Sequence, residues 1–211
     1  SSPASIGIAL YPDNAEGYED LLMAADAAMY ESKRSRRGGY RFYTDSMNVA
    51  VRERFDLAQE LREAMDRKEF LLVYQPKIEA ATGRVVGAEA LVRWASPKRG
   101  LVSPMDFIPL VDEIGLQGRL GEWVLDTACA QAVAWESMGY ASLSISVNVS
   151  PAQFHDGEIM VHVREALARH GLDSRHLELE VLESMAVSDY AGTTSILAAL
   201  REMGVGVALD D

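Results

Sequence analysis

The sequence predicts an α/β fold in which strands and helices alternate and form a mainly parallel sheet. The first observation is the order of the second half, where short apolar runs are separated by amphipathic segments that end at glycine. Strands separated by helices imply right-handed βαβ units and parallel pairing. The second observation is the composition, because 48% hydrophobic and 25% charged residues are typical of a packed globular protein. A largely disordered or low-complexity chain is therefore excluded.

The N-terminal part of the chain is expected to form a strand, a helix and a second strand. The apolar run 5–10 predicts the first strand, and a turn follows at Pro12. Residues 18–35 predict an amphipathic helix, because their apolar residues recur at helical spacing. Residues 40–43 predict a brief strand, and the polar run 44–48 marks an expected boundary.

The next part of the chain is expected to contain a helix and a β-hairpin. Apolar spacing predicts a helix over residues 49–67, and the run 70–75 predicts a strand. The turn residues 81–83 lead into a second apolar run, 85–92, so these two strands are expected to pair in antiparallel. Ser103-Pro104 predicts the start of the next helix, with serine as N-cap and proline in the first turn.

The remaining residues predict the alternating helices and strands of the parallel sheet. Each expected helix is followed by a glycine, which favours the left-handed conformation that commonly closes a helix. The expected order is helix 119–138, strand 143–149, helix 157–170, strand 177–182, helix 189–203 and strand 206–210.

The charge of the chain limits its partners. The 211 residues have a formal net charge of −12, whereas binding to duplex nucleic acid through phosphates requires a basic face. We therefore expect no duplex nucleic acid as partner, and we expect an anionic substrate to be held through a bound metal. Cys129 is the single cysteine, so no intrachain disulfide can form. No apolar run reaches the roughly 18 residues of a membrane-spanning helix.

Several polar residues interrupt predicted strands that are otherwise apolar. They are Glu89, Asn148, Glu180 and the pair Asp210-Asp211. Burying an unpaired carboxylate costs on the order of several kcal/mol, so this recurrence favours a functional role. The C-terminal strand ends of a (β/α) barrel converge on the active site, and oxygen ligands of this kind suit Mg²⁺ or Mn²⁺. The alternative is that these residues cap helices or lie at solvated strand ends; for the whole set, metal binding is the favoured interpretation.

The segment Glu89-Ala90-Leu91-Val92-Arg93-Trp94 resembles the signature of the EAL domain, a cyclic di-GMP phosphodiesterase. Further segments resemble the motifs of this family in the family's order. They are YQPKI at 74–78, PMDFIP at 104–109, SVNVSPAQF at 146–154, LEVLES at 179–184 and ALDD at 208–211. The resemblance covers residues 55–211 and implies a partial TIM-like (β/α) barrel of the EAL type, because a complete (β/α)₈ barrel needs roughly 250 residues.

Residues 1–47 resemble the C-terminal tail of a GGDEF domain, the diguanylate cyclase fold. The similar segments are SIGIA at 5–9 and ADAAMYESK at 25–33. They imply the last strand–helix piece of that α/β domain. The motif that names the GGDEF domain does not occur in this chain, so the resemblance gives no support for cyclase activity. We expect residues 48–54 to be a linker into the first EAL helix.

The EAL resemblance implies a site for two divalent metal ions. Glu89, Asn148, Glu180 and Asp210 would ligate Mg²⁺ or Mn²⁺, and Asp211 would complete a second metal position. Of these residues, Glu89, Asp210 and Asp211 would also be catalytic. Two metal ions can lower the pKa of a bridging water and stabilise the attacking and leaving oxygens at phosphorus.

The resemblance also implies residues that bind the substrate, cyclic di-GMP. Gln75, Leu91 and Arg93 would contact the nucleotide, and the Arg93 guanidinium would reach a phosphate. The alternative role of Arg93 is a surface ion pair. Glu183 would stabilise the loop after its strand, and Glu178 is expected to be structural.

Two functions fit the resemblance. The first is metal-dependent hydrolysis of cyclic di-GMP to linear pGpG in bacterial second-messenger signalling; the second is a regulatory module that binds cyclic di-GMP without cleaving it. The complete set of metal ligands favours the enzyme. The chain itself is expected to be an incomplete and inactive fragment, because the family's catalytic lysine and last glutamate are not in it. The expected location is the cytoplasm, and the expected assembly is a homodimer through the EAL domain.

Overall fold

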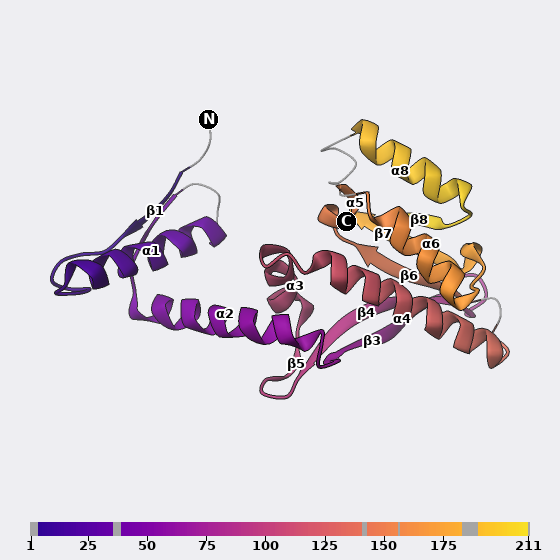
Figure 1. Ribbon diagram of the computed structural model, residues 1–211, viewed down its shortest axis with the longest axis horizontal. Helices are drawn as coiled ribbons and strands as arrows, with labels where there is room; N and C mark the ends of the chain where they lie inside the picture. Colours follow the sequence, from indigo (N-terminus) through magenta and orange to yellow (C-terminus); the bar gives the residue numbers. More distant parts are fainter. Residues whose placement is uncertain (1–3, 36–38, 141–142, 156, 183–189, 211) are drawn as a thin grey trace. The chain divides into compact units, whose positions relative to one another are not determined.

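The computed structural model describes residues 4–35, 39–140, 143–155, 157–182 and 190–210 (Figure 1). The chain divides into two compact units, Ser1–Glu60 and Leu61–Asp211. Each unit combines strands with helices, so the predicted α/β class is confirmed. No helix among the described residues is long and apolar enough to cross a lipid bilayer.

The first unit contains a two-stranded parallel sheet packed against a helix. β1 (Ser5–Ile8) pairs with β2 (Gly39–Phe42), and α1 (Tyr18–Ser35) precedes β2 in the chain. The strand and the helix lie in close contact because Gly7 has no side chain, since a Cβ there would lie 1.9 Å from the Ala25 carbonyl oxygen. The predicted order of strand, helix and strand is therefore confirmed.

Two boundaries in this part of the chain differ from the prediction, and local structure explains both. The first strand ends at Ile8 because Leu10 and Asn14 close a turn. The Leu10 N–H donates to Asn14 Oδ1, and the Leu10 carbonyl accepts from the Asn14 N–H, both at 2.8 Å. α2 (Asp45–Ala64) begins inside the polar run 44–48, which was expected to be a boundary. Short polar and acidic side chains favour a helix N-terminus, so this run starts a helix instead of separating elements.

The second unit is built on one mixed sheet. Its strands are β3 (Phe70–Ile78), β4 (Val85–Ser96), β5 (Gly100–Val102), β6 (Ser144–Val149), β7 (Leu177–Leu182) and β8 (Gly206–Asp210). β3 and β5 both pair with β4 in antiparallel, whereas β4, β6, β7 and β8 are successive parallel neighbours. The predicted hairpin and the predicted parallel sheet are therefore confirmed. No strand was predicted at β5, because three residues are too few to show an alternating pattern.

The helices of this unit follow the predicted order, with one addition. They are α3 (Pro104–Glu113), α4 (Gln117–Ser137), α5 (Pro151–His155), α6 (Ile159–His170) and α8 (Tyr190–Glu202). The short α5 was not predicted, because five residues give no helical periodicity. Ser103 occupies the N-cap position of α3 as predicted, but its side chain makes no capping bond. Gly171 closes α6 in the left-handed conformation with φ of 68°.

The two faces of the sheet differ in polarity, because side chains alternate along each strand. One face is apolar and includes Ala90 on β4, Val147 on β6 and Leu179 on β7, all buried. α4 packs against β6, and Figure 1 shows α4 and α6 running beside the sheet. The alternate residues of the same strands form the opposite, polar face. They are Glu89, Ser146, Asn148, Glu178 and Glu180. We call this the polar face; it carries the candidate site.

An aromatic cluster holds the C-terminal part of β4 against the helices. The Trp94 indole is fully buried, and its ring centroid lies 6.2 Å from Phe70 and 6.0 Å from Phe107. Trp123 on α4 joins the cluster through Phe70, at 6.0 Å. Trp94 Nε1 also donates a hydrogen bond to Glu69 Oε2 at 2.9 Å. The cluster therefore ties β3, β4, α3 and α4 together just beyond Arg93.

The buried thiol of Cys129 gives a testable expectation about the core. Burial within α4, together with the charge of Asp126, raises the pKa of the Cys129 thiol to about 12. At pH 8.5 the reactive thiolate is then about 10³-fold rarer than in an unfolded chain. Alkylation of the native protein by iodoacetamide, followed by mass spectrometry, is expected to be slower than alkylation in urea by at least this factor. Equal rates in the native and unfolded protein would show that the Cys129 thiol is accessible and that its pKa is not raised.

Candidate functional site

Three neighbouring parallel strands bring predicted site residues together on the polar face. Glu89 lies on β4, Asn148 on β6 and Glu180 on β7. Asn148 is directly opposite Glu180 in the β6–β7 register, and Glu89 is opposite Ser146, two residues before Asn148. Residues paired across adjacent strands point to the same side of a sheet. The strand register alone therefore gathers these predicted residues at one place.

Glu89 and Asn148 are in direct contact. The Asn148 Nδ2 amide donates a hydrogen bond to Glu89 Oε1 at 2.7 Å, although 59 residues separate the two along the chain. The Glu89 side chain is half-buried, whereas Asn148 is exposed. The bond orients both groups and leaves the amide oxygen and the second carboxylate oxygen as ligand atoms for a hard cation.

Glu180 has a partner that the sequence did not reveal. Lys77 Nζ donates to Glu180 Oε1 at 2.6 Å, to Glu178 Oε1 at 2.7 Å and to Ser146 Oγ at 2.5 Å. Ser146 Oγ in turn donates to Glu178 Oε1 at 2.8 Å. The strand was predicted to end at Gln75, but β3 continues to Ile78, so Lys77 lies on this strand two residues after Gln75 and therefore on the same face.

The ionisation of this cluster follows from its contacts. Hydrogen bonding by the Lys77 ammonium is the main cause that lowers the pKa of Glu178, and the Ser146 hydroxyl adds to it, while partial burial acts in the opposite direction. Burial by itself would lower the pKa of Lys77, but its bonds to Glu178 and Glu180 and their charges together outweigh burial and raise it. Lys77 and Glu178 are therefore both charged at neutral pH.

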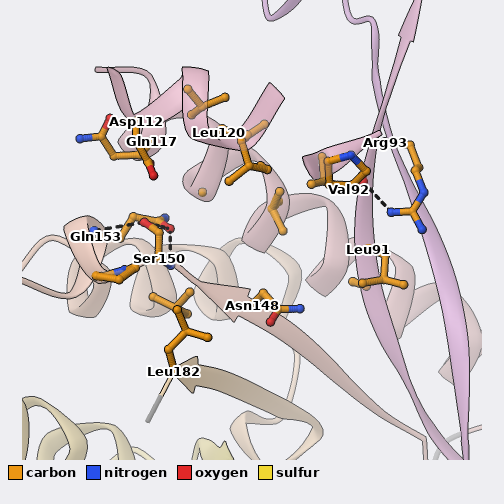
Figure 2. A pocket seen from close by; sticks show the side chains of 18 residues that line it. Leu91, Val92, Arg93, Asp112, Gln117, Leu120, Asn148, Ser150, Gln153 and Leu182 are labelled. Carbon is orange, nitrogen blue, oxygen red and sulfur yellow. Dashed lines mark hydrogen bonds between the residues drawn. The ribbon is translucent and has the colours of Figure 1, made fainter. Parts of the chain in front are cut away.

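A cavity of about 390 Å³ lies beside Asn148 at the C-terminal ends of β4 and β6 (Figure 2). Leu91, Arg93, Asn148 and Leu182 contribute to its wall, and most of the remaining lining is apolar and comes from α3 and α4. Figure 2 shows Ser150 hydrogen-bonded to Gln153, which fixes the turn that follows Asn148. A pocket of apolar walls with a few polar groups suits a ligand that has both aromatic and charged parts.

Two of the three predicted substrate-binding residues line this pocket. Leu91 and Arg93 line it, and the Arg93 Nη1 donates to the Val92 carbonyl at 2.8 Å, as Figure 2 shows. Gln75 on β3 is paired with Glu89 on β4 and is exposed on the same face. The structure thus places all three within two adjacent strands, β3 and β4.

Not every predicted site residue falls within the described part of the chain. Asp211 and Glu183 lie outside the described residues. Asp210 is placed by its backbone at the end of β8, where it pairs with Leu182 on β7. Leu182 follows Glu180 by two residues and therefore lies on the same face of the sheet. The backbone position of Asp210, which is paired with Leu182, belongs to that face as well.

The residues present fit a divalent cation in their chemistry. Glu89 and Glu180 offer carboxylate oxygens and Asn148 offers an amide oxygen, which are the ligands that Mg²⁺ and Mn²⁺ prefer. Within the described ranges, no three His, Cys, Asp or Glu side chains converge as a ready metal-binding group. One of the three predicted ligands within the described residues is an amide, and Glu180 is hydrogen-bonded by Lys77, so these donors would form part of a site rather than a closed cage.

Comparison with protein families finds a match that covers most of the chain. The family described as EAL domain matches residues 58–211, which include every predicted site residue. Among curated proteins, the bifunctional diguanylate cyclase/cyclic di-GMP phosphodiesterase MucR of Pseudomonas aeruginosa is 46% identical over 208 residues, covering 99% of this chain and 30% of MucR. The oxygen sensor protein DosP of Escherichia coli is 36% identical over 209 residues, covering 99% of this chain and 26% of DosP. The chain thus spans less than a third of the length of these relatives.

Solved structures agree with the sequence matches. The MucR phosphodiesterase of P. aeruginosa in complex with c-di-GMP matches with a TM-score of 0.72 and 45% identity, over 74% of this chain and 63% of that one. The EAL domain of Xanthomonas citri FimX in complex with c-di-GMP matches with a TM-score of 0.68 and 25% identity, over 77% of this chain and 62% of that one.

Proposed function

The chain belongs to the EAL domain family, and on that premise we propose that it contributes the metal and nucleotide sites of a cyclic di-GMP phosphodiesterase. The reaction would be hydrolysis of one phosphodiester bond, in which water adds to phosphorus and the ribose 3′ oxygen leaves. The product would be the linear dinucleotide pGpG. The observation that carries the proposal is the contact of Glu89 with Asn148, next to Glu180 across the strand register.

We assign the metal-ligand role to Glu89, Asn148, Glu180 and Asp210, with Asp211 at a second metal position. A bound Mg²⁺ or Mn²⁺ would activate water and offset the negative charge that builds up on the phosphate during displacement. The chain's own part is to hold the ligand atoms in place. The Asn148–Glu89 bond does this for two of them, because it fixes both side chains before a cation arrives. Asp210, at the end of β8, and Asp211, the next residue in the sequence, would complete the set.

The substrate would be held by the pocket beside Asn148. Leu91 gives an apolar wall for a base, and Arg93 supplies a guanidinium for a phosphate, by bonds that are charge-assisted and can be bidentate. In the structure, one donor of Arg93 is used by the Val92 carbonyl, which holds the side chain against its own strand at the pocket wall. Gln75, on the neighbouring strand, would add a neutral hydrogen bond. Glu183 would stabilise the loop after β7.

We further propose that residues 1–47 derive from the end of a GGDEF domain, that residues 48–54, which lie within α2, form a helical linker, and that residues 55–211 are the EAL part. The strand–helix–strand of β1, α1 and β2 supports this assignment. A second support is that MucR, whose name includes diguanylate cyclase, matches 99% of the chain rather than the EAL part alone.

The proposal is tested by titrating the chain with cyclic di-GMP in a calorimeter, with Mn²⁺ and then with EDTA. Binding that depends on the metal supports the proposal, and absence of binding in both conditions contradicts it. Chromatography of cyclic di-GMP incubated with the protein that carries this chain then separates the two functions. Conversion to pGpG supports the phosphodiesterase, whereas tight binding without conversion identifies a binding module.

The substitution Arg93→Ala is expected to weaken binding of cyclic di-GMP by about 10- to 100-fold while leaving Mn²⁺ affinity unchanged. A hydrogen bond to a charged group contributes roughly 1.5–3 kcal/mol, and roughly 1.4 kcal/mol corresponds to tenfold in affinity. Calorimetry with nucleotide and with Mn²⁺ measures both values. Arg84→Ala is the matched control, because Arg84 is an exposed arginine that precedes the other end of β4. Unchanged nucleotide affinity in Arg93→Ala would show that Arg93 does not bind the substrate.

A further inference from the structure

The Lys77 ammonium is surrounded by oxygen atoms in the way that a bound cation would be. Ser146 Oγ, Glu178 Oε1 and Glu180 Oε1 lie 2.5, 2.7 and 2.6 Å from Nζ, so all three ammonium hydrogens have an acceptor. These oxygens come from β6 and β7, whereas Lys77 comes from β3. The side chain therefore crosses β4 to reach its partners.

A glycine lies on β4 opposite Lys77. Gly87 on β4 is paired with Lys77 on β3, so both residues belong to the same face of the sheet. Gly87 therefore adds no side chain to β4 at the position paired with Lys77. A Cβ on Gly87 would lie 2.4 Å from the Ser144 hydroxyl oxygen of the next strand, so the tight packing here excludes larger residues.

The cluster has one positive and two negative charges, and one of the negative charges belongs to a proposed metal ligand. The Lys77 side chain is about one third exposed, and that of Glu180 is 11% exposed, so water screens the pair only in part. Without the ammonium, Glu178 and Glu180 would lie close together on one face of β7 with no cation between them. A carboxylate in such a place needs a counter-ion.

We propose that Lys77 is an internal counter-ion that holds Glu180 in the metal-free protein and competes with the divalent metal for that carboxylate. The inference rests on the proposed function, in which Glu180 is a metal ligand. Glu178 has a distinct part in this arrangement: it shares the ammonium with Glu180 and so weakens the hold of Lys77 on the ligand. Removing the ammonium therefore strengthens metal binding, and removing the charge of Glu178 weakens it.

The experiment measures Mn²⁺ affinity of the 211-residue chain by calorimetry, without nucleotide. Lys77→Met, which keeps the length of the side chain without its charge, is expected to bind Mn²⁺ about tenfold more tightly. Glu178→Gln is expected to bind Mn²⁺ about threefold more weakly, because Lys77 then serves Glu180 alone. Lys77→Arg keeps the charge and is the matched control, with affinity close to that of the unmodified chain. Circular dichroism verifies that each variant is folded.

Thermal unfolding gives a second measurement that does not depend on affinity. In EDTA, Lys77→Met is expected to unfold at a lower temperature than the unmodified chain, because two carboxylates lose their counter-ion. Saturating Mn²⁺ is expected to reduce this difference, since the metal then neutralises Glu180. A lysine with only a packing role would lower stability equally in both conditions and would not tighten metal binding.

The possible failures are distinguishable. If the unmodified chain binds Mn²⁺ and Lys77→Met binds it equally or more weakly, the counter-ion role is wrong and the proposed function stands. If Lys77→Met does not fold, Glu178→Gln decides the question, because unchanged or tighter Mn²⁺ binding there overturns the competition. If neither the unmodified chain nor any variant binds Mn²⁺, the metal site of the proposed function fails, and this inference fails with it.

Discussion

Replacing Glu89 with alanine is expected to abolish the metal-dependent hydrolysis of cyclic di-GMP that we propose. The substitution removes one proposed metal ligand, and a second, Asn148, loses the hydrogen bond that orients its amide. Bound metal contributes several kcal/mol of transition-state stabilisation, and roughly 1.4 kcal/mol corresponds to tenfold in rate. A fall in hydrolysis rate of about 10³-fold or more is therefore expected, with Mn²⁺ affinity reduced by about 10²-fold or more.

Two further variants make this prediction specific. Glu89→Gln keeps the size of the side chain and an oxygen that can accept from Asn148, but it removes the charge. Its Mn²⁺ affinity is also expected to fall, which would assign the effect to the charge rather than to packing. Glu122→Ala is the control, because Glu122 is an exposed glutamate on α4 away from the polar face. Full hydrolysis and unchanged Mn²⁺ binding by Glu89→Ala would show that Glu89 is not a metal ligand.

The largest expected effect on stability comes from Trp94→Ala. The indole is fully buried, contacts Phe70 and Phe107, and donates to Glu69 Oε2. Truncating a buried tryptophan to alanine typically costs about 3–5 kcal/mol, because packing contacts are lost and a cavity remains. Urea unfolding followed by circular dichroism is expected to show this loss in the free energy of unfolding.

Trp94→Phe distinguishes the contribution of aromatic packing from that of the hydrogen bond to Glu69. It keeps an aromatic side chain in the cluster but removes the donor to Glu69, so a smaller loss of about 1–3 kcal/mol is expected. Because Trp94 follows Arg93 on β4, the alanine variant is also expected to lower nucleotide affinity more than the phenylalanine variant does. An unchanged free energy of unfolding for Trp94→Ala would mean that the aromatic cluster does not support the sheet.

Most of the fold could be predicted because periodicity and glycine signals are local. The boundaries of α1 and β7 follow directly from apolar spacing and from the polar residues around it. The errors are local too: β5 and α5, with three and five residues, are too short for a pattern to repeat, and the start of α2 lies in a polar run that was expected to be a boundary.

The site could be predicted only in part. Glu89, Asn148 and Glu180 are visible in the sequence as polar residues that interrupt apolar strands, and their common face follows from the strand register. The pairing of Lys77 with Glu180 could not be read from the sequence, because 103 residues separate them and two strands, β4 and β6, lie between β3 and β7. Long side chains that cross a neighbouring strand leave no periodic signal.

The alternation of a buried apolar face with a polar face has a consequence for how such a sequence can evolve. Single substitutions on the polar face change one ligand or one partner and leave Leu179 and its buried neighbours in place. Insertion or deletion of one residue within β6 or β7 would rotate every later side chain of that strand to the other side. In β7, glutamate side chains would then point into the apolar core, and leucine side chains would point to the polar face. Insertions and deletions are therefore expected in the loops, whereas the strands are expected to change by substitution of single residues, which keeps their register.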